Sequence, residues 1–199
     1  MTDSPFTPDK EQIAALEPFE RLPLARIELV ATRAQAQRAI GELDAARVLG
    51  FDTESKPTFA KGEVSDGPHI LQLATLDKAW IFQLHDLDCR AALAAWIAAH
   101  PSKKVGFGLG DDVKRIRSKL GVEPTGIVDL NHLFRARGYR KDIGVKTAVA
   151  VLFERRFLKS GKASTSNWAA RQLGESQLMY AANDAWAAVR VFEAMGEGA

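Results

Sequence analysis

The order of hydrophobic and polar positions predicts alternating strands and helices from about residue 26 onward. Short apolar or alternating runs predict strands at 26–30, 48–52, 69–74, 78–82, 104–107 and 126–129. Apolar positions at helical spacing predict helices at 32–46, 89–99, 111–120 and 175–195, with further helices between the last strand and residue 175. A hairpin at 69–82 followed by strand–helix alternation indicates an α/β fold, with a mixed sheet of five or six strands and helices on both faces.

The first 25 residues do not share this pattern. They contain four prolines and no sustained periodicity. We expect an N-terminal extension at 1–25, with one helical turn after Asp9, and a domain at 26–199. No basic stretch followed by an apolar run opens the chain, and no segment approaches ~18 apolar residues. The sequence therefore predicts neither a signal peptide nor a membrane helix.

Composition narrows the class of protein. The chain has 199 residues, of which 46% are hydrophobic and 26% charged, as expected for one globular domain with a sizeable core. Its single cysteine, Cys89, excludes an intramolecular disulfide and a cysteine-rich zinc site. A reducing, cytoplasmic environment is the expectation for its location.

The net charge of +2 hides an uneven distribution of charge. Residues 135–162 carry nine basic and two acidic side chains, a net +7, and the other residues carry 18 basic and 23 acidic ones, a net −5. Lysine and arginine contacts to phosphates are strong and independent of base sequence. The basic segment therefore fits a nucleic-acid strand, although an ordinary solvated surface would have the same composition.

Two acids follow the apolar run at 48–52. Asp52 and Glu54 are two residues apart, so on a strand they share one face. Neighbouring carboxylates raise each other's pKa, and a divalent cation removes that cost because Mg²⁺ and Mn²⁺ prefer oxygen ligands. Either a metal site or a solvated strand end explains this pair.

A glycine-rich turn precedes the helix at 111–120. Segment 106–112 lacks a dinucleotide-binding fingerprint, because Asp111 stands where a glycine is needed, and no Gly-Lys-Ser/Thr follows. The glycines instead allow a tight turn from strand to helix. Asp111 or Asp112 is then either a metal ligand or the helix N-cap.

The final helix carries a tyrosine and an acid one turn apart. Tyr180 and Asp184 share a face otherwise rich in alanine, which would let the helix lie close to the sheet. Taken alone, this is also the pattern of a buried tyrosine bonded to an aspartate. Together with the other acids, it predicts four carboxylates at one sheet edge, an arrangement that suits two metal ions and phosphodiester cleavage.

These residues occur in the order of a known family. Segments 51–54, 71–74, 105–108 with Asp112, 166–168 and 180–185 resemble the DEDDy 3′–5′ exonucleases, above all the ribonuclease D group and the Werner-type exonuclease domain. The resemblance spans about residues 26–195. Segment 143–149 departs from the family's apolar helix at Gly144 and Lys146.

The resemblance implies a ribonuclease H-like three-layer fold and two-metal hydrolysis at a 3′ end. The products would be nucleoside 5′-monophosphates, and the cofactors two Mg²⁺ or Mn²⁺ ions. By motif, the metal ligands are Asp52, which bridges both ions, Glu54, Asp112 and Asp184. Tyr180 is the tyrosine that positions or helps to deprotonate water.

The expected partner is the 3′ end of a DNA or RNA strand, most simply a single strand. Lys159 and Lys162 immediately precede the matched Asn167 and Trp168, so we expect these four residues to contact the nucleic acid. Phe107 could stack on a base or pack in the core, and Phe59 is a second stacking candidate.

Three other functions fit parts of the sequence. An oligoribonuclease-like enzyme for very short RNA would share the acids, but the long basic segment favours a longer strand. A catalytically silent nucleic-acid-binding module would lack at least one of the five catalytic positions, and all five are filled. A plain interaction domain would require every motif to be coincidental.

Overall fold

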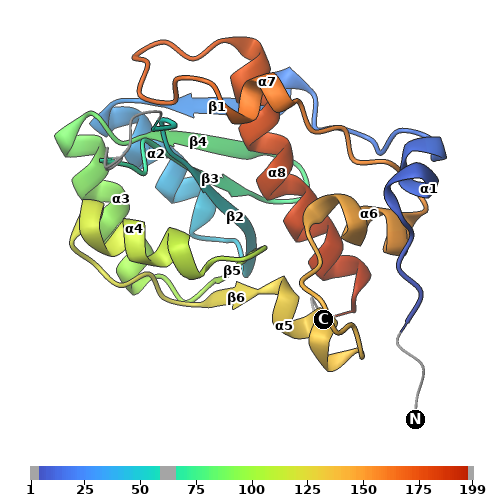
Figure 1. Cartoon of the computed structure of the whole chain (residues 1–199). Coiled ribbons are helices and arrows are strands. Elements are labelled where there is room, and N and C mark those ends of the chain that lie inside the picture. Colours follow the sequence, from blue (N-terminus) through green and yellow to red (C-terminus); the bar gives the residue numbers. More distant parts are fainter. Residues whose placement is uncertain (1–4, 59–65, 197–199) are drawn as a thin grey trace.

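A six-stranded mixed sheet forms the middle layer of the computed structural model, which describes residues 5–58 and 66–196 (Figure 1). The strands lie in the order β1-β4-β3-β2-β5-β6. They are β1 (Ile27–Val30), β2 (Val48–Glu54), β3 (Ile70–Ala74), β4 (Ala79–Gln83), β5 (Lys103–Gly106) and β6 (Ile127–Asp129).

The central strand β2 joins two differently built halves of the sheet. On one side it pairs antiparallel with β3, so that Asp52 lies opposite Gln72. On the other side it pairs parallel with β5, which pairs parallel with β6. The carboxyl ends of β2, β5 and β6 therefore meet at one edge of the sheet, where the acidic motifs were expected to converge.

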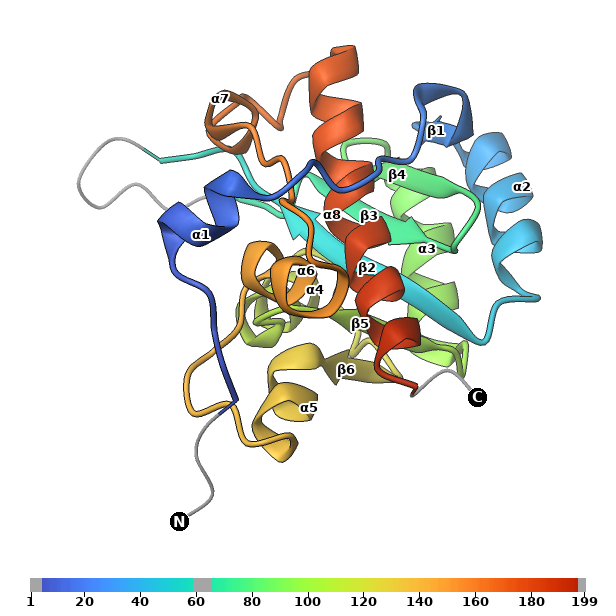
Figure 2. The ribbon, with the colours of Figure 1, turned by 90° about the vertical axis from the view of Figure 1, so that its right-hand side faces the viewer.

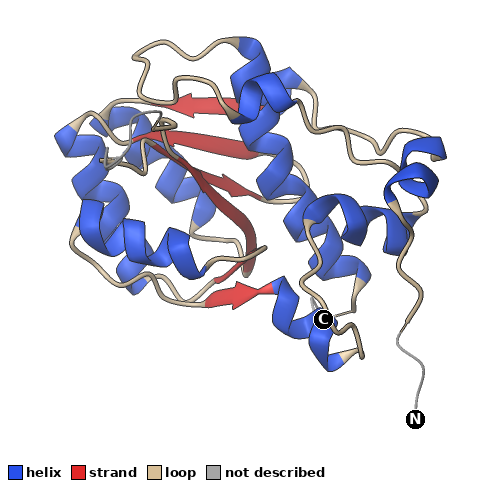
Figure 3. Ribbon diagram, in the orientation of Figure 1, coloured by secondary structure: helices blue, strands red, loops and turns tan. Residues whose placement is uncertain are grey.

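Helices cover both faces of the sheet (Figure 3). Helices α2 (Arg33–Leu43), α3 (Leu87–Ala99) and α4 (Gly110–Leu120) enclose one hydrophobic core with one face. Helices α5 (Leu130–Ala136), α6 (Val145–Phe153), α7 (Gly161–Ser164) and α8 (Glu175–Ala194) contribute to the core on the other. The predicted three-layer α/β arrangement with a mixed sheet is confirmed.

Local sequence signals explain several of these elements. The hydroxyl of Thr32 accepts the backbone amide of Gln35 and so caps α2. The side chain of Gln35 accepts the backbone amide of Thr32, which completes a capping box. The predicted turn after Asp9 is helix α1 (Lys10–Ala15), which Asp9 caps in the same way. None of the helices described has both the length and the apolar character that crossing a bilayer requires.

The N-terminal segment packs against the domain. After α1 the chain crosses the outer side of α8 and passes through the short helix η1 (Leu24–Arg26) into β1 (Figure 2). Phe19 and Leu22 are buried in the core on the α8 side of the sheet. The amide of Leu22 donates to Asn183 Oδ1 of α8 at 2.8 Å. The domain boundary at residue 25 stays a prediction, but the segment before it shares this core.

Helix α8 lies unusually close to the sheet because Gly50 of β2 has no side chain. A Cβ at position 50 would lie 1.8 Å from the carbonyl oxygen of Ala185. The facing surface of α8 is made of small side chains, with Ala181, Ala182 and Ala185 fully buried. The predicted close approach of the last helix to the sheet is therefore confirmed.

We expect Gly50→Ala to destabilise the protein and to displace α8 from β2. The added methyl cannot be accommodated by a side-chain rotation, since the atoms it meets are backbone. Overpacking of this kind typically costs about 1–3 kcal/mol. Urea unfolding would measure the loss of stability.

Gly41→Ala is the matched control for that substitution. Gly41 lies within α2 with no atom within 4 Å of a Cβ built on it. Alanine there should raise the free energy of unfolding by roughly 0.5–1 kcal/mol, because it favours the helical backbone. Equal stability of the two variants would contradict the close approach at Gly50.

Candidate active site

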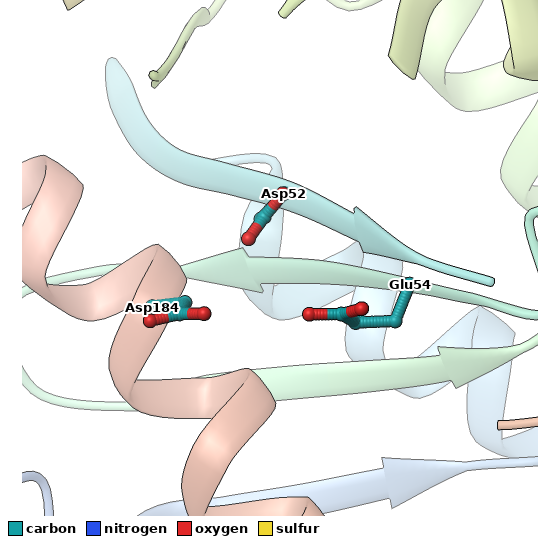
Figure 4. A group of neighbouring side chains, drawn as sticks. All are labelled: Asp52, Glu54 and Asp184. Atoms are coloured by element: carbon teal, nitrogen blue, oxygen red, sulfur yellow. The ribbon is translucent and has the colours of Figure 1, made fainter. Parts of the chain in front are cut away.

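The candidate site begins at the end of β2, where the side chains of three consecutive residues point alternately to the two faces of the sheet. Asp52 and Glu54 lie on the face of the sheet that α8 covers (Figure 4). Thr53 points to the opposite face, and its amide donates to Asp52 Oδ1 at 2.8 Å. The strand therefore presents two carboxylates side by side, as its sequence predicts.

Asp184 of α8 completes a group of three acids. Asp52, Glu54 and Asp184 each contribute a carboxylate oxygen to a set whose members lie within 4.8 Å of one another (Figure 4). They line a cleft of about 630 Å³ at the edge of the sheet. Three oxygen donors this close together fit a hard divalent cation such as Mg²⁺ or Mn²⁺.

Asp112 enters the same cleft from the first turn of α4. It stands outside the group of three, but the hydroxyl of Thr53 donates to Asp112 Oδ1. The neighbouring Asp111 is exposed at the rim and pairs with Lys114 at 2.9 Å. The structure thus places the fourth predicted acid, Asp112 rather than Asp111, against β2.

A distant aspartate, Asp129, holds the glycine turn that precedes α4. Its two carboxylate oxygens accept the backbone amides of Gly108 and Leu109, each at 3.1 Å. Gly108 has a φ of 67°, a left-handed conformation that favours glycine. The alternative that Asp111 or Asp112 caps this helix is therefore wrong. Sequence reasoning missed Asp129, whose only signal was its place at the end of a strand.

The clustered acids hold protons more tightly than isolated ones. Burial, then the charges of Asp184 and Asp112, keep the pKa of Asp52 well above its ordinary value. Burial and the charge of Asp184 raise the pKa of Glu54 to about 8. Burial also raises the pKa of Asp112 and that of Asp184. Without compensating cations, the cluster is electrostatically costly at neutral pH.

Lys159 supplies positive charge inside this cluster. Its Nζ lies 2.7 Å from Asp184 Oδ2 and 5.1 Å from the centre of the Tyr180 ring. Burial lowers the pKa of the Lys159 ammonium, but the charge and hydrogen bonding of Asp184 outweigh burial and raise it overall. Sequence reasoning placed Lys159 on the strand path, whereas here it contacts a candidate metal ligand.

Tyr180 is held one turn before Asp184 on α8, as the sequence predicts. Burial and the adjacent Asp184 carboxylate raise its pKa, so the phenol is protonated at neutral pH. The ring packs against Trp168 with centroids 5.8 Å apart. Trp168 is 1% exposed, so it packs against Tyr180 from the interior of the protein. Direct contact of Trp168 with nucleic acid stays a prediction.

Of the other residues predicted to contact nucleic acid, some line the acidic cleft and some do not. Phe107 is half-buried and lines the cleft, with its ring 6.4 Å from that of Phe134. Asn167 and Lys162 are exposed and lie outside the residues that line the cleft. Phe59 falls outside the described residues. The structure therefore brings Phe107 and Lys159 to the acids, and leaves the binding roles of all these residues as predictions.

Comparison with known proteins identifies the family of the chain. A family model described as 3′–5′ exonuclease matches residues 27–198, from β1 to beyond the end of α8. The chain belongs to the 3′–5′ exonuclease family. The resemblance of its motifs to the DEDD-type exonucleases is thereby confirmed, and membership of this family implies nuclease activity.

Relatives and solved structures agree with this assignment. The chain is 27% identical to the exonuclease mut-7 homolog of Aedes aegypti, covering 94% of the chain but 28% of that protein's length. The Aedes aegypti Nibbler EXO domain superposes with a TM-score of 0.72 at 22% identity, covering 89% of this chain and 90% of the other. The RNase D of Trypanosoma brucei in complex with RNA gives a TM-score of 0.74 at 19% identity, covering 93% and 64%. The ribonuclease H-like fold is confirmed.

The raised pKa values predict how the stability of the metal-free exonuclease depends on pH. Glu54 holds its proton in the folded state up to about pH 8 but releases it near pH 4.5 when unfolded. The folded state binds more protons in that window, so stability should fall as the pH rises from about 4.5 to about 8. Melting temperatures in a chelator would measure the decline, and Mg²⁺ should oppose it.

Glu54→Gln should flatten part of that pH dependence, because the amide does not titrate. Glu193→Gln, at the exposed end of α8, serves as a control and should leave the profile unchanged. A melting temperature of the native protein that stays level across the window would contradict the electrostatic cost of the cluster.

Proposed function

We propose that the protein is a metal-dependent 3′–5′ exonuclease that removes nucleoside 5′-monophosphates from a single-stranded end. The observation that carries this proposal is the cleft lined by Asp52, Glu54, Asp112 and Asp184. Three of these acids offer oxygens within 4.8 Å of one another, and burial opposes their ionisation. Such a cleft is suited to concentrating divalent cations.

Two divalent ions, Mg²⁺ or Mn²⁺, would be held by these four carboxylates. Asp52 would be the acid shared by both ions, a role supported by the closeness of its carboxylate to those of Glu54 and Asp184. Bound ions of this kind lower the pKa of a coordinated water and stabilise charge on a leaving oxygen. Hydrolysis would join the water oxygen to phosphorus and break the P–O3′ bond, which leaves a new 3′ hydroxyl.

Tyr180 and Lys159 have complementary roles in this proposal. The protonated phenol of Tyr180 can donate a hydrogen bond to a water held near Asp184. The ammonium of Lys159 partly neutralises Asp184 in the metal-free protein, and lies where the phosphate of a bound strand would need a positive contact. Trp168 beneath the Tyr180 ring keeps the phenol in position.

The strand can be DNA or RNA, since phosphate contacts do not depend on the sugar. The structural likeness to an RNase D that was solved with RNA supports a nucleic-acid substrate. The minimum length of strand that is cleaved distinguishes this proposal from the oligoribonuclease-like alternative, which acts on very short RNA. Matched 5′-labelled DNA and RNA strands of graded length, digested with Mg²⁺ or Mn²⁺, would report direction, sugar preference and minimum length together.

Asp112→Asn should lower the rate of digestion by more than about a hundredfold, because a candidate metal ligand loses its charge. Asp52→Asn and Asp184→Asn should do the same with the fold retained, and a chelator should abolish activity of the native protein. The rate would be measured from the appearance of mononucleotides. Full activity in the chelator would overturn the metal-dependent mechanism.

Asp111→Asn provides a matched control for Asp112→Asn. The two residues are adjacent in sequence, but Asp111 is exposed and pairs with Lys114. Digestion by Asp111→Asn should remain within about twofold of the native rate, as for other surface changes. Equal losses in the two variants would show that α4 presents its acids differently from this structure.

Lys159→Gln should weaken binding of a single strand more than Lys162→Gln does. Lys159 lines the cleft, whereas Lys162 is exposed on α7 outside its lining. Loss of one phosphate contact should reduce the slope of log affinity against log salt by about 0.7. Fluorescence anisotropy over a salt series would measure it, and an unchanged slope for Lys159→Gln would remove that residue from the strand path.

A further inference from the structure

A second groove of about 670 Å³ adjoins the acid cleft. Residues of α1, of the start of α6 and of the segment at 156–159 line it, and we refer to it as the α1 groove. Figure 2 shows how α1 and α6 lie relative to each other. Lys146, Thr147 and Lys159 line both the α1 groove and the acid cleft. The two hollows therefore lie next to each other, and a strand that leaves the acid site past these three residues would meet the α1 groove.

The α1 groove is lined by basic and apolar side chains. The cations are Lys10, Lys146, Arg156 and Lys159, and none of the described residues that line the groove is acidic. Apolar side chains in the lining are Ile13, Leu158, which is 39% exposed, and Phe157, which is buried at its edge. Basic side chains complement phosphates, and apolar side chains complement the faces of unpaired bases.

Helix α1 is held firmly enough to act as a wall. The guanidinium of Arg156 donates to the carbonyl of Ala14 at 2.7 Å. The backbone of Arg156 also pairs on both sides, donating to Glu17 O at 2.8 Å and accepting from Phe19 N at 2.9 Å. The spacing of Lys10, Ile13 and Ala14 puts all three on one side of the helix, facing the groove.

This wall lies outside the part of the chain that the family model matches. The match begins at residue 27, whereas the groove takes Lys10, Ile13 and Ala14 from the segment before it. The segment read from sequence as a plain extension therefore contributes a surface next to the acids. A binding role for this surface therefore does not follow from the match to the family model.

We propose that the α1 groove binds the single strand on the 5′ side of the bond to be cleaved. Phosphates contact Lys10 and Lys146 while bases lie against the apolar side chains of Ile13 and Leu158. This inference rests on the proposed function, because it requires a strand whose 3′ end is in the acid cleft. The groove lengthens the footprint of the enzyme beyond the terminal nucleotide without adding any base-specific contact.

The test is the dependence of binding and cleavage on strand length. Cleavage efficiency and affinity of the native protein should rise with length over 5′-labelled oligonucleotides from two to about twelve nucleotides, as the groove fills. Lys10→Glu should lower affinity for the long strands by roughly threefold or more, the effect of losing one phosphate contact. Cleavage of the dinucleotide should fall less than cleavage of the long strands, because a substrate this short fills less of the groove.

Arg38→Glu is the matched control. Arg38 is exposed on α2, on the opposite side of the sheet, and the substitution changes net charge by the same amount. It should leave the length dependence as in the native protein. A loss equal to that of Lys10→Glu would mean that overall charge, and not the groove, governs binding, and would overturn the proposal.

Asp9→Ala distinguishes the effect of an ordered helix α1 from the effect of net charge. The change makes the protein more basic, but it removes the cap that accepts the amides of Glu11 and Gln12. A six-residue helix depends on such a cap, so the wall should loosen and affinity for long strands should fall. A rise in affinity would show that net charge alone is acting, and the groove would be rejected.

Failure of this inference is distinguishable from failure of the proposed function. Anisotropy of long strands, measured with Asp112→Asn to prevent digestion, reports binding independently of chemistry. If the native protein degrades nothing, the exonuclease proposal fails whatever the groove does. If it degrades dinucleotide and long strand equally well, and Lys10→Glu changes neither affinity nor cleavage, the groove proposal fails alone.

Discussion

The contact between Gly50 and the backbone of α8 is the constraint on which the rest of the structure depends. Because position 50 has no side chain, the carbonyl of Ala185 can lie directly over β2. That closeness brings Asp184, the preceding residue of α8, to the carboxylates of Asp52 and Glu54. A larger side chain in the central strand would separate the helix from the sheet, and the acids would no longer share one cleft.

Opposite charges lie side by side at this cleft, although the net charge of the whole chain is only +2. Buried carboxylates gather at the end of β2 although burial and mutual repulsion raise their pKa values. Lys159 offsets part of that repulsion from within, and basic side chains follow the α1 groove away from it. Negative charge is thus concentrated at the end of β2 and positive charge beside it, which suits the proposed binding of cations in the cleft and of phosphates in the groove.

Sequence patterns predicted the strands of the sheet, the helical turn after Asp9 and the sharing of one face by Asp52 and Glu54, because each depends on neighbours within a few residues. The remaining features depend on contacts between distant segments. Asp129 holds a turn about twenty residues before it, and Asn183 binds Leu22 across most of the chain. No local pattern encodes such pairs. Likewise, the placement of Lys159 beside Asp184 depends on how the segment before α7 returns to α8.

The position of Asp184 on α8 also determines when, during synthesis of the chain, its clustered acids can come together. Asp52 and Glu54 lie on β2 and leave the ribosome long before α8 does. The group of three acids forms only after α8 has docked on β2, because Asp184 belongs to that helix. A chain cut before α8 therefore lacks the complete acidic group on which the proposed activity depends.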